Sequence, residues 1–354
     1  MRSSFIQNSI PGPGMSGRER VILATVVRGY VASARAVGSR WVARHSGLGL
    51  SSASIRNCMM DLEERGFLTH HHTSGGRVPT NAGYRLFVDE LMGRAVLGPR
   101  VEATITGALA TTRFGSLETL LDQACVMLGQ LSDQLSVILS PRYDRGVVER
   151  IEINQIDEHR ILVVFRMISG LERTVIVGID EEIDSEDLRQ TLQAMNMIAK
   201  GKTLPEILES SRHDETRVRL RGLRLPDAIY LGAGELQDGE TKDHFHLWGA
   251  SNMLAQPEFT NRELLRRILR ALEEKEVLSG LLEPTRHRKN VTITIGEENP
   301  VEELRDCSVV SVSYRFGEFG GSIGVIGPTR MPYEYVVSLV DFLAQTMGKA
   351  LVHN

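Results

Sequence analysis

The feature that most constrains the fold is a series of three short helical patterns near the N-terminus. Apolar residues recur at helical spacing over 18–34, which predicts an amphipathic helix with one buried stripe. A second, shorter helix is expected over 39–47, with Ser39 as its N-cap. Gly47 and Gly49 then mark a tight turn before the third pattern. Three short helices with a glycine turn before the third are typical of a helix-turn-helix.

The third helical pattern, which begins at Ser51 or Ser52, has two chemically different faces. The face expected to be buried contains Ile55, Cys58, Met59 and Leu62. The opposite face contains Ala53, Arg56, Asn57 and Met60. In the major groove of DNA, arginine binds guanine, asparagine binds adenine and small hydroxyls bind either, and a recognition helix carries such residues in its N-terminal half. The pattern favours a DNA-reading helix, although an ordinary surface helix with a serine cap would share it.

A hairpin pattern follows the third helix directly. Residues 67–69 read as a strand, residues 70–76 as a polar tip with glycines, and residues 77–80 as the returning strand. A hairpin directly behind a recognition helix is typical of a winged helix, and we expect Arg77 to lie along the phosphate backbone or the minor groove. The three consecutive histidines at 70–72 make a poor metal site, because adjacent strand residues point to opposite faces.

Charge is distributed unevenly along the chain. Residues 1–94 carry 12 arginines, no lysine and six acidic residues, whereas the remaining 260 residues carry 29 basic and 39 acidic residues. A basic module of net charge +6 on a body of net charge −10 indicates an anionic partner for one end, and nucleic acid is the obvious candidate. The residues expected to contact double-stranded DNA are Arg40, Ser51, Ser52, Ser54, Arg56, Asn57, Thr73, Ser74 and Arg77.

Several long runs of this sequence resemble the heat-inducible transcription repressor family, HrcA. In the N-terminal region the matching runs are VGS, SSASIRN followed by MMDLEERGFL, HTSGGRVPT and GYR. In the body they are IYLGAGELQ, PEFTNRELLRRILRALEEKEVL, IGEENP, CSVVSVSYRFGE and GSIGVIGPTRMPYEYVVSLV. The resemblance covers nearly all of the chain beyond residue 17, with one departure at His71, where the family pattern leads us to expect proline.

The resemblance implies a negative regulator of bacterial heat-shock chaperone genes. Such a repressor acts as a homodimer on an inverted-repeat promoter operator of the CIRCE type, in chaperonin and DnaK-type operons. It is released on heat stress, and the GroEL chaperonin modulates its activity. The implied fold is a winged helix-turn-helix followed by a GAF-like α+β domain that an inserted dimerisation domain interrupts. The expected boundaries are a flexible tail over 1–17, the winged helix over 18–94, the GAF-like domain over 95–180 and 285–354, and the inserted domain over 181–284.

Patterns in the body independently predict an α+β fold, with strands before and after a helix-rich middle. Helices are expected over 101–112, 116–138, 185–201, 261–282 and 333–351. Strands are expected over 147–156, 160–168, 173–179, 291–296, 307–316 and 321–327. The leucine stripe of the second helix is expected to form core or dimer packing rather than to line a ligand site.

The sequence contains no pattern typical of a catalytic or cofactor site, such as a P-loop, H-E-x-x-H or G-x-S-x-G. We therefore expect no enzyme activity, no cofactor and no metal; His244 and His246 have no third ligand near them in sequence. The three cysteines, Cys58, Cys125 and Cys307, lie far apart, which argues against a disulfide scaffold and favours a cytoplasmic protein. No apolar run approaches the ~20 residues of a membrane-spanning helix, so no membrane partner is expected.

Two other interpretations remain open on the sequence. The GAF-like body would serve as a small-molecule sensor if a pocket with converging polar groups existed, and that hypothesis rests on fold analogy. An enzyme with an appended DNA-binding domain is disfavoured by the missing motifs. The segment GPTRMPY at 327–333 suggests no mechanism, and we expect only a tight turn that begins the last helix.

Overall fold

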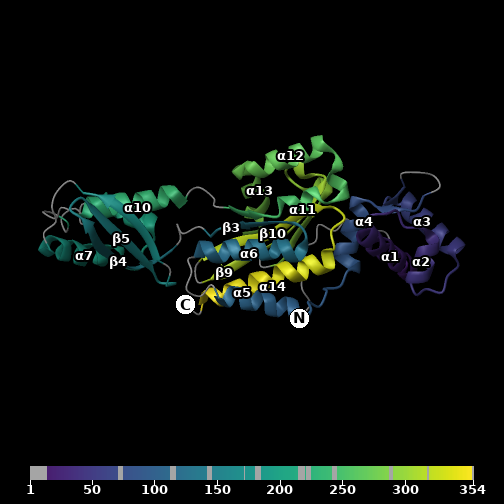
Figure 1. Cartoon of the computed structure of the whole chain (residues 1–354), viewed down its shortest axis with the longest axis horizontal. Coiled ribbons are helices and arrows are strands. Elements are labelled where there is room, and N and C mark those ends of the chain that lie inside the picture. The colour runs from purple at the N-terminus through teal and green to yellow at the C-terminus, as the bar shows by residue number, and fades with distance from the viewer. Residues whose placement is uncertain are drawn as a thin grey trace. The chain divides into compact units, whose positions relative to one another are not determined.

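The structure is a computed structural model of the whole chain (Figure 1). It describes residues 14–70, 75–111, 117–141, 146–170, 172–179, 185–213, 220, 225–240, 245–286, 290–316 and 319–352. The chain forms two compact units. The first contains residues 1–138, 246–313 and 322–346, and the second contains residues 139–245, 314–321 and 347–354. Helices combine with sheets of two, five and three strands, so the predicted α+β class is confirmed.

Three helices open the first unit, as the sequence predicted. They are α1 (Gly17–Ser33), α2 (Ser39–His45) and α3 (Ser52–Glu64). The prediction that Ser39 caps α2 is wrong: Gly38 is the N-cap with an extended backbone, and Ser39 is the first helical residue. Gly47 and Gly49 both adopt the left-handed conformation, with φ of 67° and 64°, which the tight turn before α3 requires.

A small apolar core joins these helices to a two-stranded sheet. Strand β1 (Leu68–Thr69) pairs antiparallel with β2 (Val78–Pro79), and Val37 forms a further antiparallel bridge with Arg77. Tyr30 lies four residues beyond Val26 on the apolar stripe of α1, but it is only half-buried. The side chains that are fully buried in this core include Ile22, Leu23, Val26, Val27, Val42, Ile55, Leu62 and Leu68.

The helix that leads out of this region changes its winding part-way. Helix α4 (Asn81–Leu86) is capped by Thr80, whose hydroxyl accepts a hydrogen bond from the Gly83 N–H. It continues as a π-helical turn, η1 (Phe87–Leu91). Buried Phe87 and Val88 anchor that turn in the core.

A five-stranded sheet forms the rest of the first unit, with strand order β7-β3-β10-β9-β8. Its strands are β3 (Leu135–Leu139), β7 (Phe245–Trp248), β8 (Thr292–Ile295), β9 (Cys307–Phe316) and β10 (Phe319–Pro328). The helices are α5 (Pro99–Thr111), α6 (Leu117–Ser132), α11 (Ala250–Leu254), α12 (Arg262–Glu273), α13 (Lys275–Arg286) and α14 (Tyr333–Val352). Its described residues also form the 3-10 turns η3 (Pro257–Thr260), η4 (Gly296–Glu298) and η5 (Glu302–Leu304). Figure 1 shows α6 and α14 on one side of this sheet and α12 and α13 on the other.

Two predicted helices are each interrupted in the structure. The helix expected over 116–138 stops at Ser132, because Asp133 takes a left-handed φ of 54° and the chain turns into β3. All five residues of β3 are buried, which a central strand with both faces covered requires. The helix expected over 261–282 is split into α12 and α13, because Glu274 adopts an extended backbone with ψ of 109°.

The second unit pairs a small sheet with its own helices. Its strands β4 (Val148–Asp157), β5 (Arg160–Met167) and β6 (Glu172–Gly178) are antiparallel in that order. Its helices are α7 (Ser185–Ala199), α8 (Leu204–Ser210) and α10 (Pro226–Glu240). Asn196 ties α7 to β4, since its side chain accepts from the Ile151 N–H at 2.7 Å and donates to the Ile151 carbonyl at 2.9 Å.

The division into units differs from the boundaries expected from the sequence. The insertion was expected over 181–284, whereas the second unit takes in 139–245. The reason is packing: β4–β6 pair with one another and contact α7 and α10, so these strands belong with the helices that follow them. Helices α12 and α13 instead belong to the unit that contains the five-stranded sheet.

Candidate nucleic-acid interface

Helix α3 presents the polar face that the sequence predicted. Ile55, Met59 and Leu62 are buried, whereas Arg56 and Asn57 are exposed. Within the described part of the chain, neither of these two side chains has a hydrogen-bond or ion-pair partner. The N-terminal half of α3 therefore carries a free cation and a free amide in adjacent positions, on a helix whose other side is fixed by the core.

Serine hydroxyls close the N-terminus of α3. Ser51 is the N-cap: its Oγ accepts a hydrogen bond from the Ser54 N–H at 3.1 Å. The two hydroxyl oxygens of Ser51 and Ser54 also lie 3.0 Å apart, so both take part in the cap. Ser52 is the first helical residue and is half-buried. Of the predicted serines, Ser51 and Ser54 therefore already have partners within the helix end.

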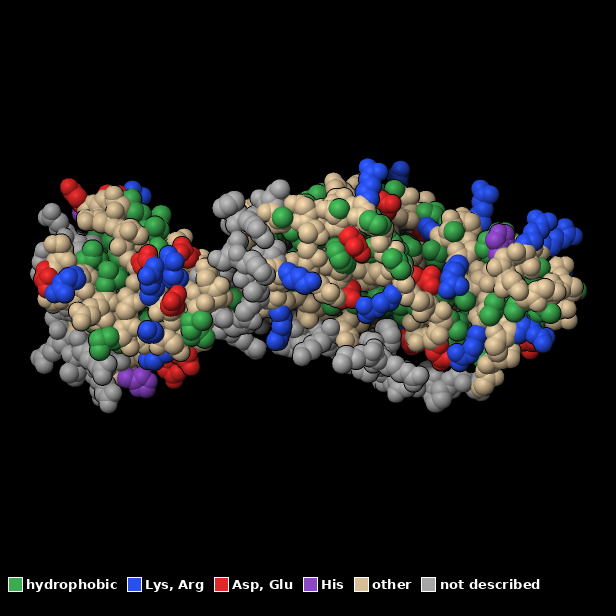
Figure 2. All heavy atoms as spheres, turned by 90° about the horizontal axis from the view of Figure 1, so that it is seen from below, with side chains coloured by type: hydrophobic (Ala, Val, Ile, Leu, Met, Phe, Trp, Pro, Cys, Tyr) green, Lys and Arg blue, Asp and Glu red, His purple; other side chains and the backbone are tan. Residues whose placement is uncertain are grey.

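The arginines of the N-terminal region separate into two groups. Among the described residues, those with a carboxylate partner are Arg20, Arg28, Arg65, Arg77, Arg85 and Arg94. Those without an ion pair to any described residue are Arg18, Arg35, Arg40, Arg44 and Arg56. Figure 2 shows basic side chains projecting from the end of the molecule that α1–α3 form. The excess positive charge is thus partly neutralised internally and partly free for an external anion.

Three of the free arginines lie on α2 or directly before it. Arg40 and Arg44 are exposed one turn apart on α2, and Arg35 lies in the connection from α1. Arg18 lies at the other end of the helices, because neighbouring Glu19 pairs with Arg65 beyond the C-terminus of α3 at 2.9 Å. The sequence prediction included Arg40 and missed Arg44, although the spacing of four residues on one short helix was the signal that places both on one face.

A tryptophan on α2 is a second residue that the sequence prediction missed. Trp41 is 39% exposed and stacks on His45, with ring centroids 3.9 Å apart. A Cβ added to Gly29 would lie 2.6 Å from the Trp41 ring, so α1 and α2 meet closely here. The signal was its position: Trp41 directly follows Arg40 on the same short helix.

The structure gives Arg77 a different setting from the one the sequence suggested. Its side chain is 16% exposed, and its Nε lies 2.7 Å from the Glu63 carboxylate. Glu63 also pairs with His70, so one carboxylate in the last turn of α3 holds residues from both sides of the β1–β2 pair. Thr73 and Ser74, the other predicted DNA contacts of this hairpin, lie outside the described residues.

The body shows no arrangement typical of catalysis or metal binding within the residues that the structure describes. His246 pairs with Asp122 at 2.6 Å and Glu118 at 3.2 Å, but no group of three or more potential ligands placed to hold a metal is found in the described ranges. His244 lies outside these ranges. Burial raises the pKa of the Cys125 thiol to about 11 and of Cys307 to about 12, so both are inert packing thiols at neutral pH.

A search of the described residues finds no helix that is both long enough and apolar enough to cross a membrane.

Comparison with known proteins identifies the family. The family model of the HrcA protein C-terminal domain matches residues 118–337. A heat-inducible transcription repressor HrcA from Chlorobium phaeobacteroides is 34% identical over 350 residues, which cover 94% of this chain and 97% of that protein. The chain belongs to the HrcA family. A second HrcA repressor, from Symbiobacterium thermophilum, is 34% identical over 334 residues, with 94% and 97% coverage.

Membership of the HrcA family supports a role as a transcriptional repressor, which is how the curated relatives are named. The family resemblance noted in the sequence is thereby confirmed. A solved structure described as a hypothetical protein at 2.2 Å resolution is similar in fold, with a TM-score of 0.63 and 22% identity. The similarity covers 96% of this chain and 99% of that one.

Proposed function

We propose that this HrcA chain represses heat-shock chaperone genes by binding, as a homodimer, to an inverted-repeat promoter operator. The observation that best supports this function is that Arg56 and Asn57 lie exposed at adjacent positions of α3. The opposite face of the helix, with Ile55 and Met59, is buried in the core. Arginine and asparagine are the side chains that read guanine and adenine in the major groove. A helix so anchored holds them in a defined orientation toward the base edges.

The first three helices and the β1–β2 pair act in this proposal as a winged helix-turn-helix. The free guanidinium groups of Arg40 and Arg44 lie one turn apart on α2, the helix before the reading helix, and suit phosphate oxygens along the DNA backbone. The capped N-terminus of α3 adds backbone N–H groups that favour an anion. Arg77 acts in this arrangement by holding the hairpin to α3 through Glu63.

Two reading helices related by a two-fold axis match an inverted repeat, so dimerisation follows from the shape of the proposed operator. The body supplies the dimer contact in this proposal, with the five-stranded sheet as the GAF-like domain and residues 139–245 as the inserted domain. Occupancy of the promoter blocks transcription in the bacterial cytoplasm, and heat stress releases the repressor. The GroEL chaperonin, a partner implied by the family, keeps the repressor competent for DNA.

The experiment is operator binding by purified protein in the presence of chaperonin, measured by fluorescence anisotropy. The duplexes are an inverted repeat of the chaperone-operon type and a scrambled duplex of equal length at the same salt concentration. Preference for the inverted repeat at a stoichiometry of two chains per duplex supports the proposal. Equal weak binding to both duplexes contradicts it. Repeating the titration with and without chaperonin, before and after a heat step, tests the heat signal separately. Equal operator binding with and without chaperonin would contradict a role for the chaperonin.

A further inference from the structure

The turn between β10 and α14 does more than begin a helix. Arg330 lies in this turn, inside the GPTRMPY segment, and its side chain is only 13% exposed. Its guanidinium donates to three separate places: Nη1 to the Val31 carbonyl at 2.8 Å, Nη2 to Gln256 Oε1 at 3.0 Å, and Nε to Glu258 Oε1 at 2.5 Å. One side chain of the body therefore holds the end of α1.

The chemistry of this contact favours a fixed geometry. Val31 lies in the last turn of α1, where carbonyls lack partners within the helix and attract cations. Glu258 neutralises the guanidinium with a second contact of 3.3 Å from Nη2 to Oε2, so the pair is bidentate. Removing one member of such a poorly exposed pair leaves the other without its charge partner, which is costly.

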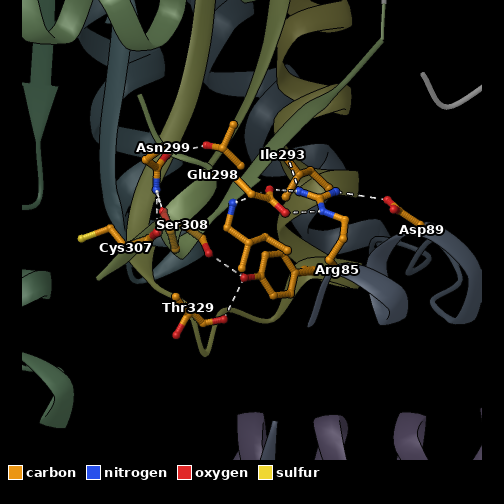
Figure 3. A network of polar contacts seen from close by, with 12 residues as sticks. Arg85, Asp89, Ile293, Glu298, Asn299, Cys307, Ser308 and Thr329 are labelled. Atoms are coloured by element: carbon orange, nitrogen blue, oxygen red, sulfur yellow. Dashed lines mark hydrogen bonds and ion pairs between the residues drawn. The ribbon is translucent and has the colours of Figure 1, made fainter. Parts of the chain in front are cut away.

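A second arginine joins the same two regions in the opposite direction, because it belongs to the N-terminal region and binds the body. Arg85 on α4 donates from Nε to Glu298 Oε1 at 2.8 Å and from Nη2 to the Ile293 carbonyl at 2.8 Å (Figure 3). Its Nη1 bonds Asp89, one turn further along the chain, at 3.1 Å. Glu298 is itself held by the Ile295 N–H at 2.9 Å. The carboxylate that receives Arg85 therefore cannot move freely.

The surface between these two arginines is tightly packed. The rings of Tyr84 and Tyr333 lie 5.9 Å apart, and both residues are at most 2% exposed. The Tyr333 hydroxyl donates to the Thr329 carbonyl at 2.7 Å and lies 2.6 Å from Ser308 Oγ (Figure 3). A Cβ added to Gly296 would overlap the side chain of Asn81 at the start of α4.

Two further ion pairs join arginines of the N-terminal region to carboxylates of the body. Arg28 pairs with Glu334 at 2.9 Å, and Arg94 pairs with Asp341 at 2.6 Å. Arginines of the basic N-terminal region thus meet carboxylates of the acidic body. The N-terminal region is held to the body by charged contacts at several points, rather than by a free linker.

This arrangement bears on how two reading helices reach two half-sites. Domains joined within one chain move relative to each other by default, whereas a dimeric helix-turn-helix protein reads half-sites whose separation matches its own geometry. We propose that Arg330 is a positioning residue that fixes the orientation of α1–α3 on the body and thereby determines the half-site spacing that the repressor accepts. The proposal rests on the proposed function, since it requires a dimer on an inverted repeat.

The test compares Arg330→Gln with the wild-type protein on three kinds of duplex. The first is the inverted repeat, the second a series with the same half-sites and a spacer changed by up to about half a helical turn, and the third a single half-site. We expect Arg330→Gln to lose about 10-fold in affinity for the preferred spacing, a typical coupling between distant sites. Its spacing preference should shrink, while its half-site affinity stays at the wild-type value. Arg266→Gln is the matched control, because Arg266 is an exposed arginine of the body paired with Glu263 on the same helix.

Three outcomes overturn the proposal. The first is that Arg330→Gln keeps the full spacing preference of the wild type. The second is that its affinity falls by the same factor for the half-site as for the operator. The third is that Arg266→Gln reproduces the effect of Arg330→Gln. If Arg330→Gln does not fold, the same duplex series is measured with Glu258→Gln. This variant weakens the ion pair of Arg330 but leaves the guanidinium and its hydrogen bond to Val31 in place, and an unchanged spacing preference then overturns the proposal. A wild-type protein that does not distinguish operator from scrambled duplex overturns the proposed function itself, and this is seen before any variant is compared.

Discussion

The carboxylate of Glu63 lies 2.7 Å from Nε of Arg77 and also pairs with His70. Glu63 belongs to the last turn of α3, whereas His70 follows β1 and Arg77 precedes β2. One acidic side chain of the helix therefore fixes both ends of the described hairpin. This relationship assigns Arg77 a structural task that its sequence position alone did not suggest.

The first prediction concerns that ion pair. Arg77→Ala should lower the free energy of unfolding by about 1–2 kcal/mol, because it leaves a poorly exposed carboxylate with one charge partner fewer. Urea unfolding of Arg77→Ala, Glu63→Ala and the double variant measures the coupling in a cycle. A coupling free energy near zero, together with an Arg77→Ala variant as stable as the wild type, would contradict this structural role. Arg77 would then be expected to contact the DNA phosphate backbone instead.

The second prediction concerns direct reading of bases. Arg56→Ala or Asn57→Ala should each weaken operator binding by about 1–3 kcal/mol and leave unfolding unchanged, since both side chains point away from the core. Anisotropy titrations with the operator and the scrambled duplex separate specific from general loss. Arg18→Ala is the control, an exposed arginine at the opposite end of the helices. The orientation of α3 is wrong if Arg56→Ala binds the operator as the wild type does.

The third prediction concerns phosphate contacts. Arg40→Gln and Arg44→Gln should weaken binding to operator and scrambled duplex by similar factors, because phosphate contacts carry no sequence information. Each should also lower the slope of log affinity against log salt by about 0.9, the value for one phosphate contact on B-DNA. Unchanged slopes in both variants would place the DNA away from α2.

The fourth prediction concerns pH. Burial lowers the pKa of His246, but hydrogen bonds and charges from Glu118 and Asp122 raise it by more, so it lies above the ordinary 6.5. A raised pKa in the folded state stabilises the protein fully below pH 6.5, and this contribution is lost as the pH rises through the folded value. The stability difference between wild type and His246→Gln should therefore shrink as the pH is raised from about 5 to about 8.

Thermal unfolding at several pH values measures this trend. His159→Gln, at an exposed histidine of the β4–β5 turn, serves as the surface control. A His246→Gln difference that is constant or grows with pH would contradict the assigned pairing with Glu118 and Asp122.

Features that depend on neighbouring residues were predictable from the sequence. The faces of α3 follow from helical periodicity, and a serine cap at Ser51 or Ser52 follows from the residue types that close helix ends; the structure selects Ser51. Strands β4 to β6 and β8 to β10 all lie where alternating or apolar runs indicated them. Each of these signals is contained in a window of a few residues.

Features that depend on distant partners were not predictable. The break between α6 and β3 requires a left-handed backbone at Asp133, which helical periodicity does not reveal. The site residues show the same limit: no local pattern indicated the ion pair between Arg77, which precedes β2, and Glu63 at the end of α3. Arg330 and Val31 are separated by 299 positions in the chain, so no local pattern linked the GPTRMPY segment to α1.

Base reading by α3 is tested most directly by a titration of wild-type protein and Arg56→Ala, in the presence of chaperonin, against operator and scrambled duplexes at one salt concentration. We expect the wild type to prefer the inverted repeat, with two chains per duplex, and Arg56→Ala to lose most of this preference while its binding to the scrambled duplex stays nearly the same. Equal binding of the wild type to both duplexes, or an Arg56→Ala variant with the full preference, would contradict it.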